Sequence, residues 1–264
     1  MLTVVKNQIK VTSLAIKYAL MREMTNKATF LSNIIFMILN NSVMIFQWLI
    51  LYNINGQIGG YTLKNILLLW AIFAGWYGVS HFIFKNAFHL SDIINSGQLD
   101  TVLVQPKNVL ISIITNSIET SAIGDIIYAY ILFFIYGFSI KDFLLFTLFI
   151  ITGGLIIVSI MVILGSLSFW KGKSDVFVDT FNSIVGLVAT YPEGIFNGLV
   201  KILLYTIVPL GFVSYMPVNL MTSFSPLILG GILLYTAIMI ALAFLIFNLG
   251  LKRYSSTNLM NARM

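Results

Sequence analysis

The chain alternates long apolar runs with short polar connections along nearly its whole length. A run of about 20 apolar residues is long enough to cross the hydrocarbon core of a bilayer as a helix. The pattern therefore predicts an all-α integral membrane protein with six transmembrane helices. The predicted spans cover about residues 29–52, 63–84, 110–137, 143–169, 176–190 and 226–250.

The composition excludes a water-soluble fold. Hydrophobic residues make up 59% of the sequence and charged residues 9%, against about 45–50% and about 25% in soluble domains. Six spans use most of the 264 residues and leave no room for a soluble nucleotide-binding domain. We therefore expect residues 1–264 to form a single transmembrane domain.

The positions of the basic residues predict the orientation. With six spans, twelve of the fifteen lysines and arginines fall on the same side as the N-terminus, and only Lys64, Lys141 and Lys201 fall on the other. Basic residues favour the cytoplasmic side. We expect a multi-pass protein of the cytoplasmic (inner) membrane with both termini in the cytoplasm. The net charge of +6 is then a membrane feature, and no nucleic-acid partner is expected.

The N-terminal segment, residues 1–27, has its own pattern. At 100° per residue, Lys6, Lys10, Ser13 and Lys17 fall within about a 60° sector, and apolar residues fill most of the rest. This favours an amphipathic helix in the cytoplasmic interface, with its lysines toward anionic lipid headgroups or a partner. An ordinary helical tail is the alternative.

The segment before the last span, residues 191–225, is apolar but interrupted. The fifth span is short and ends before Tyr191-Pro192, and two further prolines follow at Pro209 and Pro217. Proline interrupts helices, and lipid cannot satisfy a broken backbone. We predict an outer re-entrant helical hairpin buried in protein, and we expect Glu193 at its start to be exposed and solvated.

The connection between the second and third spans, residues 85–108, contains helix signals. Ser91-Asp92 is a start signal, Gly97 suits a C-cap, and Pro106 precedes the third span. A short helix here would be either an ordinary capped connector or the surface gripped by a motor subunit.

Two acids fall in the third predicted span, and ionisable residues in a span are functional candidates by default. Glu119 and Asp125 are six residues apart, so they should lie on roughly opposite faces of one helix. They would contact substrate, bind protons or make structural hydrogen bonds. Because this run exceeds the length that a span needs, its first turns, with Glu119, would lie in the cytoplasmic interface.

Small and aromatic residues predict how the helices pack. Ala71-x-x-x-Gly75 and Ala74-x-x-x-Gly78 would allow close helix contact within the chain or in a dimer. Most tryptophans, and several tyrosines, fall near predicted span ends, as expected for an interfacial aromatic belt.

No catalytic or nucleotide-binding motif occurs. The sequence has no G-x-x-x-x-G-K-[S/T] loop, no H-E-x-x-H, no G-x-S-x-G and no cysteine. We expect no metal site, no cofactor in this chain and no enzymatic activity.

Two groups of residues carry a family resemblance. The first is Gly97-x-Leu99-Asp100-x-x-Leu103-x-x-Pro106 after the second span. The second precedes the last span and consists of Tyr191-Pro192, Ile207-Val208-Pro209 and Tyr215-Met216-Pro217. With these and its N-terminal amphipathic helix, the chain resembles, over nearly its full length, the six-span permeases of type-2 ABC exporters that have no fused ATPase.

The resemblance implies a division of labour. Two permease chains, identical or related, would each dock a cytoplasmic ATP-binding subunit, which would hold ATP and Mg²⁺. A coupling helix around residues 89–103 would sit in that subunit, braced by the interface helix. Asp92 and Asp100 would make polar contacts with it, or would only cap a helix. The implied ATPase-coupling residues are Asp92, Gly97, Leu99, Asp100, Leu103 and Pro106; the interface helix presents Lys6, Lys10 and Lys17; and the pathway or gate residues are Glu119, Asp125, Tyr191, Pro192, Pro209, Tyr215 and Pro217.

The function predicted in this way is the permease of an ATP-driven exporter. Its substrate would be amphipathic or hydrophobic, such as a drug, an antimicrobial peptide or a lipid-linked molecule. One alternative is a membrane-embedded lipid-modifying enzyme, against which the scattered acids argue. The other is an accessory or immunity protein without transport activity, which an ATPase partner would distinguish from the first.

Overall fold

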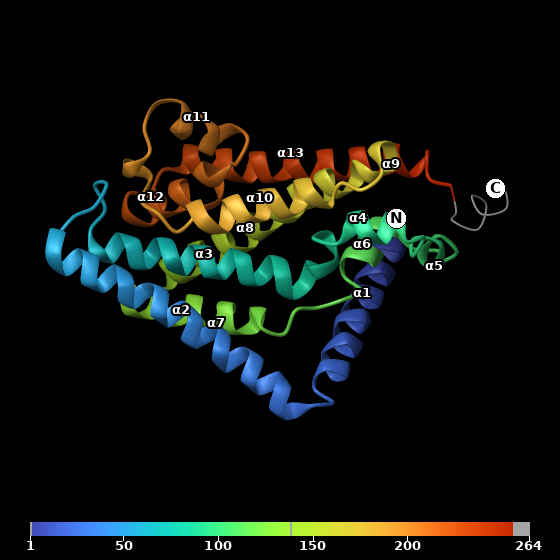
Figure 1. Ribbon diagram of the computed structural model, residues 1–264, viewed down its shortest axis with the longest axis horizontal. Coiled ribbons are helices and arrows are strands. Elements are labelled where there is room, and N and C mark those ends of the chain that lie inside the picture. The colour runs from blue at the N-terminus through green and yellow to red at the C-terminus, as the bar shows by residue number, and fades with distance from the viewer. Residues whose placement is uncertain (1, 138, 256–264) are drawn as a thin grey trace.

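A computed structural model describes residues 2–137 and 139–255 (Figure 1). The described residues form helices and no strand, apart from one bridge pair, Ile58 and Tyr61, in a turn. The elements are α1 (Leu2–Glu23), α2 (Lys27–Asn55), α3 (Leu63–Phe84), η1 (Lys85–Ala87), α4 (Leu90–Asn95), α5 (Asp100–Leu103), α6 (Val109–Ile114), α7 (Ala122–Tyr136), α8 (Ile140–Ser166), α9 (Ser168–Lys171), α10 (Asp175–Val188), η2 (Glu193–Ile195), α11 (Gly198–Thr206), η3 (Gly211–Tyr215), α12 (Met216–Thr222) and α13 (Pro226–Leu251).

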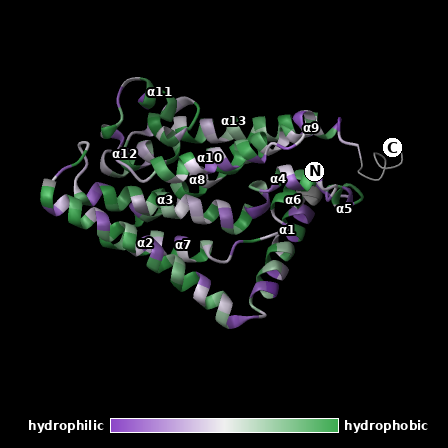
Figure 2. Ribbon diagram, in the orientation of Figure 1, coloured by the Kyte–Doolittle hydropathy of each residue, from purple (hydrophilic) through white to green (hydrophobic). Residues whose placement is uncertain are grey.

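The chain is an all-α membrane protein. Within the described ranges, α2, α3, α8 and α13 are long and apolar enough to cross a membrane, α11 and α12 form a fifth candidate if they are one bent span, and α7 is a shorter apolar helix. Their apolar colouring contrasts with the hydrophilic turn between α1 and α2 (Figure 2). The count of six spans stays a prediction.

The core lies around α3 and α8. α3 packs against both α7 and α8, α8 packs in turn against α13, and α2 packs on α7. Glycines set the close approaches, because a Cβ at Gly75 would overlap Ile150 of α8 and a Cβ at Gly78 would lie 2.9 Å from the carbonyl oxygen of Ala122. The small residues of α3 therefore serve packing within the chain.

The connections gather at two ends of the long axis. α4, α5, α6, α9 and the last turn of α13 lie at one end, which we call the α4 end, and the turn 56–62, α11 and α12 lie at the other, the hairpin end (Figure 1). In the predicted topology these ends are cytoplasmic and outer respectively.

α1 runs across the long axis near the α4 end (Figure 1). Lys6, Lys10 and Lys17 are all exposed, and so are apolar residues such as Ile9 and Tyr18. A helix that exposes both kinds of side chain and lies across a bundle of spans has the geometry of an interface helix.

The third predicted span, 110–137, is wrong as a single helix. The structure divides it into α6 and α7, with an irregular stretch between them. Asn86 Nδ2 donates to the carbonyl oxygen of Ile113 at 2.9 Å, and Lys85 pairs with Glu119 at 2.7 Å. These contacts hold the chain at the break, so Glu119 precedes α7 and shares no helix with Asp125.

Most of the residues predicted to form an aromatic belt are buried inside the protein. Trp76 is fully buried in the middle of α3 and donates through Nε1 to the hydroxyl of Ser214 at 3.1 Å. Trp48, Trp70 and Tyr52 are also buried, whereas Trp170 is exposed. These buried rings therefore belong to the protein core, and their depth in the membrane stays a prediction.

The segment before the last span is broken, as predicted. α11 and the helical stretch 211–222 meet at 75°, which is the geometry of a broken span or a re-entrant loop. Pro209 lies at the break, and Pro192, Pro209 and Pro217 are all buried. The π-helical turn η3 follows and directs Ser214 toward Trp76.

Candidate functional site

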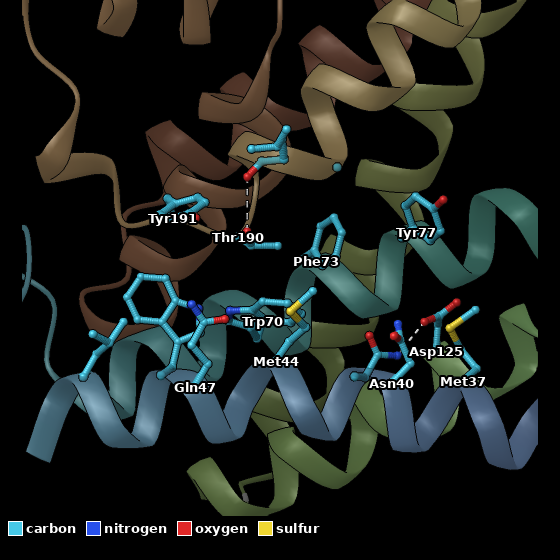
Figure 3. Close-up of a pocket in the computed structure, with 15 residues that line it drawn as sticks. Met37, Asn40, Met44, Gln47, Trp70, Phe73, Tyr77, Asp125, Thr190 and Tyr191 are labelled. Atoms are coloured by element: carbon cyan, nitrogen blue, oxygen red, sulfur yellow. Dashed lines mark hydrogen bonds between the residues drawn. The ribbon is translucent and has the colours of Figure 1, made fainter.

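A pocket of about 490 Å³ lies between α2, α3 and the end of α10 (Figure 3). Its size falls within the range of about 300–1,000 Å³ that is typical of small-molecule sites. Its lining is mixed, with amides and aromatic rings among methionines and leucines. The lining residues are Met37, Asn40, Asn41, Met44, Gln47, Trp48, Leu51, Trp70, Phe73, Tyr77, Asp125, Gly186, Leu187, Thr190 and Tyr191.

Helical periodicity builds two walls of this pocket. Residues three or four apart share a helix face, and the α2 residues from Met37 to Leu51 follow that spacing. Trp70, Phe73 and Tyr77 do the same on α3. One stripe of α2, rich in amides, thus faces one stripe of α3, rich in aromatic rings.

Asp125 is the charged group of the pocket. It lies in the first turn of α7 and its side chain is only 4% exposed. Asn41 Nδ2 donates to Asp125 Oδ1 at 2.7 Å, whereas Oδ2 is buried and has no hydrogen-bond partner among the described residues. Asp125 and Asn40 lie together at one end of the pocket, with Gln47 and Tyr191 toward the other (Figure 3).

Gly124 brings Asp125 to Asn41. A Cβ at this position would lie 2.6 Å from the backbone oxygen of Ile34 and 2.9 Å from Met37 Cβ. Only a residue without a side chain lets α2 and α7 approach this closely, and that approach places the carboxylate beside the amide.

Toward the α4 end, a smaller cavity of about 140 Å³ continues along the same face of α3. His81 lines it and stacks between Tyr77 at 3.9 Å and Phe88 at 4.0 Å. His89, the Lys85–Glu119 pair, Asp179 and Asn182 complete its polar lining. Glu119 therefore pairs with Lys85 in this smaller cavity and does not line the larger pocket.

At the hairpin end, the expectation that Glu193 is solvated is wrong. Its side chain is 14% exposed, pairs with Lys201 at 2.9 Å and accepts a hydrogen bond from the Tyr205 hydroxyl at 2.8 Å. Burial and the nearby charge of Glu193 raise the pKa of Tyr61, so this phenol stays neutral. α11 folds back so that Lys201 and Tyr205 contact Glu193. The sequence pattern alone did not predict this burial.

The hairpin end is also closely packed. A Cβ at Gly194 would overlap the backbone of Gly59, so the turn after α2 rests directly on η2. Tyr191 is partly exposed and packs edge-on against Trp48 at 5.6 Å, whereas Tyr215 is fully buried. Of the predicted pathway or gate residues, Asp125 and Tyr191 line the pocket, whereas Pro192, Pro209, Tyr215 and Pro217 are buried and do not.

The predicted coupling helix, 89–103, consists of two short helices, α4 and α5, separated by Gly97 with φ +75°. Asp92 and Leu103 are exposed, Asp100 is half-buried and Leu99 is fully buried. The buried side chain of Leu99 therefore stabilises the loop by packing against the protein core. Pro106, also exposed, precedes α6.

The predicted helix start at Ser91-Asp92 is wrong, since α4 begins at Leu90 and its N-cap makes no side-chain bond. Ser91 has another role: its hydroxyl lies 2.6 Å from that of Ser168, which lies 2.7 Å from that of Ser174. This buried hydroxyl cluster fastens α4 to the connection between α8 and α10.

The amides of α2 are the part of the site that sequence reasoning missed. Asn40, Asn41 and Gln47 lie inside the first predicted span, where side-chain amides are costly unless they find partners. Their spacing on one helix face was the available signal.

A comparison with protein families decides the class of this protein. A family model described as an ABC-2 family transporter protein matches residues 37–258. The chain belongs to the ABC-2 family of transporter proteins. No curated protein and no solved structure showed significant similarity to it.

The ABC-2 match begins at Met37 in α2 and includes every residue that lines the pocket. Members of this family are membrane components of ABC transporters, so the chain is a permease, a transport component that works with an ABC-type ATPase. No group of His, Asp and Glu residues within 2–137 and 139–255 is arranged to hold a metal ion.

Proposed function

We propose that this ABC-2 family permease is the membrane subunit of an exporter, and that the pocket between α2, α3 and α10 belongs to its substrate pathway. The observation that carries the proposal is the set of polar groups in two successive cavities beside α3. Lys85 and Glu119 line the smaller cavity, and Asp125 and Asn41 line the larger pocket. In an otherwise apolar chain, such groups suit the passage of an amphipathic molecule.

The α4 end supplies the surface for a cytoplasmic ATPase. Asp92, Leu103 and Val104 are exposed there, and Val104 is 84% exposed. α1 braces this surface, because the Asn108 backbone N–H donates to Gln8 Oε1 at 3.0 Å. The Ser91–Ser168–Ser174 hydroxyl cluster then transmits movement of α4 to α8 and α10.

A second permease, identical or related, would close the open side of the pocket. α10 buries only Val178 and Val185 within this chain, and α2 exposes large apolar residues along its length, among them Ile35, Phe36 and Val43. Lipid or a second chain must cover these faces, and the pocket opens between them. The substrate would be amphipathic or hydrophobic, and ATP and Mg²⁺ would bind to the ATPase.

Purification of the tagged chain from its native membrane is expected to recover an ABC-type ATPase in stoichiometric amount. The double variant Asp92→Lys, Val104→Asp changes two exposed residues and should lower the recovered ATPase by at least about tenfold, as loss of a central interface contact does. Quantitative mass spectrometry measures the ratio.

Gln57→Lys, an exposed change at the hairpin end, is the matched control and should keep the ATPase. If the wild-type chain recovers no ATPase in mild detergent, the exporter proposal fails and the accessory-protein alternative is favoured. A second permease in the same sample would distinguish a heterodimer from a homodimer.

The proposed sidedness predicts opposite labelling of two engineered cysteines. Gln57 at the hairpin end and Lys173 at the α4 end are exposed, and the chain has no cysteine of its own. A membrane-impermeant maleimide should label Gln57→Cys on intact cells, and Lys173→Cys only after permeabilisation. The unchanged chain is the blank, and the reverse pattern would contradict the assigned orientation.

A further inference from the structure

We propose that the pocket selects amphipathic cations, with a substrate ammonium group held against the carboxylate of Asp125. This inference rests on the proposed function and names the substrate class of the same site.

The first argument is the unmet hydrogen-bonding capacity of a buried carboxylate. Asp125 is 4% exposed, and the Asn41 amide satisfies Oδ1 alone. Oδ2 is buried without a hydrogen-bond partner among the described residues, and Asp125 lines the pocket. A buried charge is costly unless it is paired, and an ammonium group in the pocket that donates to this carboxylate would supply the missing partner with a charge-assisted bond.

The second argument is that the pocket has no cation of its own. Its lining contains no lysine, arginine or histidine. His81 stacks on the pocket-lining Tyr77 at 3.9 Å but lines the smaller cavity. Two lysines outside the pocket have acids of their own, since Lys85 pairs with Glu119 at 2.7 Å and Lys201 pairs with Glu193 at 2.9 Å. An anionic ligand would meet an uncompensated carboxylate, whereas a cation would neutralise it.

The third argument is the shape of the surrounding wall. Tyr77, Phe73 and Trp70 present ring surfaces along α3, and aromatic faces attract ammonium ions within about 6 Å. Met37, Met44 and Leu187 supply adaptable apolar surface for an alkyl or aryl body. Asp125 lies at the end of the pocket nearer the α4 end, so the cationic head would sit there and the apolar body would extend toward Tyr191 (Figure 3).

A pair of brominated probes tests this selection in the full chain, reconstituted in neutral phosphatidylcholine nanodiscs. Bromine quenches tryptophan fluorescence on contact, and Trp48 and Trp70 line the pocket. 11-Bromoundecylamine carries the ammonium group, and 11-bromoundecanol is its neutral analogue. We expect saturable quenching by the amine at a concentration at least about tenfold lower than by the alcohol, as expected for a bond to a charged group.

The variant Asp125→Asn keeps the side-chain shape and removes the charge. It should raise the half-saturating amine concentration by at least about tenfold and change the alcohol value less than twofold. Glu23→Gln removes an equal charge from α1 and should change neither. A folded Asp125→Asn chain is recognised by an unchanged elution volume; if that variant aggregates, Asn41→Leu, which removes the amide and leaves the carboxylate, should keep the preference for the amine over the alcohol.

Equal quenching by both probes, or an Asp125→Asn chain that keeps the preference for the amine, would overturn the inference while leaving the ATPase-coupled permease intact. Recovery of no ATPase from native membranes would instead remove the proposed function and leave amine binding as a property of the isolated chain.

Discussion

Replacing Gly124 with valine is expected to separate α2 from α7 and to destabilise the folded chain by about 1–3 kcal/mol, the usual cost of overpacking. Even a Cβ at this position would lie 2.6 Å from the Ile34 carbonyl oxygen. That neighbour is helix backbone, which no rotamer change can move. The Asn41–Asp125 bond spans the same contact and should break, which leaves a carboxylate without its amide. The midpoint of thermal unfolding in detergent measures the loss.

The matched control is Gly230→Val. Gly230 is exposed on α13, and a Cβ there meets nothing within 4 Å. Its unfolding midpoint should stay close to that of the unchanged chain. Equal midpoints for the two variants would show that the close approach of α2 and α7 is not required.

The second large effect is expected at the hairpin end. Gly194→Val should lift η2 away from the turn between α2 and α3, since a Cβ at Gly194 would overlap the backbone of Gly59. Hydrogen exchange should become faster in peptides that cover residues 52–63 and 190–206. The N–H groups of Ile58 and Tyr61 donate to each other's carbonyl oxygens across this turn, at 3.2 and 3.0 Å, so they report its opening directly.

Exchange within α8 should not change, because it packs at the centre of the bundle. Gly231→Ala, with no heavy atom within 4 Å of the added Cβ, is the control. If Gly194→Val exchanges like the control, the turn and η2 do not depend on each other, and the hairpin cannot act as an outer closure through this contact.

Hydropathy predicted the long helices well and failed where the backbone breaks. The second span, 63–84, coincides with α3, and the last span, 226–250, differs from α13 by one residue. The run 110–137 was predicted as one helix, because polar residues such as Thr115 and Glu119 lower the average hydropathy only slightly. Contacts from η1 to Ile113 and Glu119 determine the break, and no local pattern encodes those.

The sequence alone identified some residues of the candidate site and missed others. Asp125 was marked by its charge inside an apolar run, but its partner Asn41 is 84 residues away in sequence and carries no charge that would mark it. Glu193 was expected in solvent because it follows a proline-containing turn. Its burial depends on the tertiary fold, which brings Lys201 and Tyr205 of α11 into contact with it. No local sequence pattern encodes these contacts.

The lengths of α7 and α10 bear on the surrounding lipid. They have 15 and 14 residues, so each spans about 21–23 Å, less than the roughly 30 Å of a hydrocarbon core. A bilayer meets short helices by thinning locally, at a cost for each ångström of mismatch. If both helices cross the bilayer, as the six-span topology predicts, the membrane should be thinnest beside the pocket, to which they supply Asp125 and Leu187. Lipids with longer acyl chains should then strain the walls of the pocket.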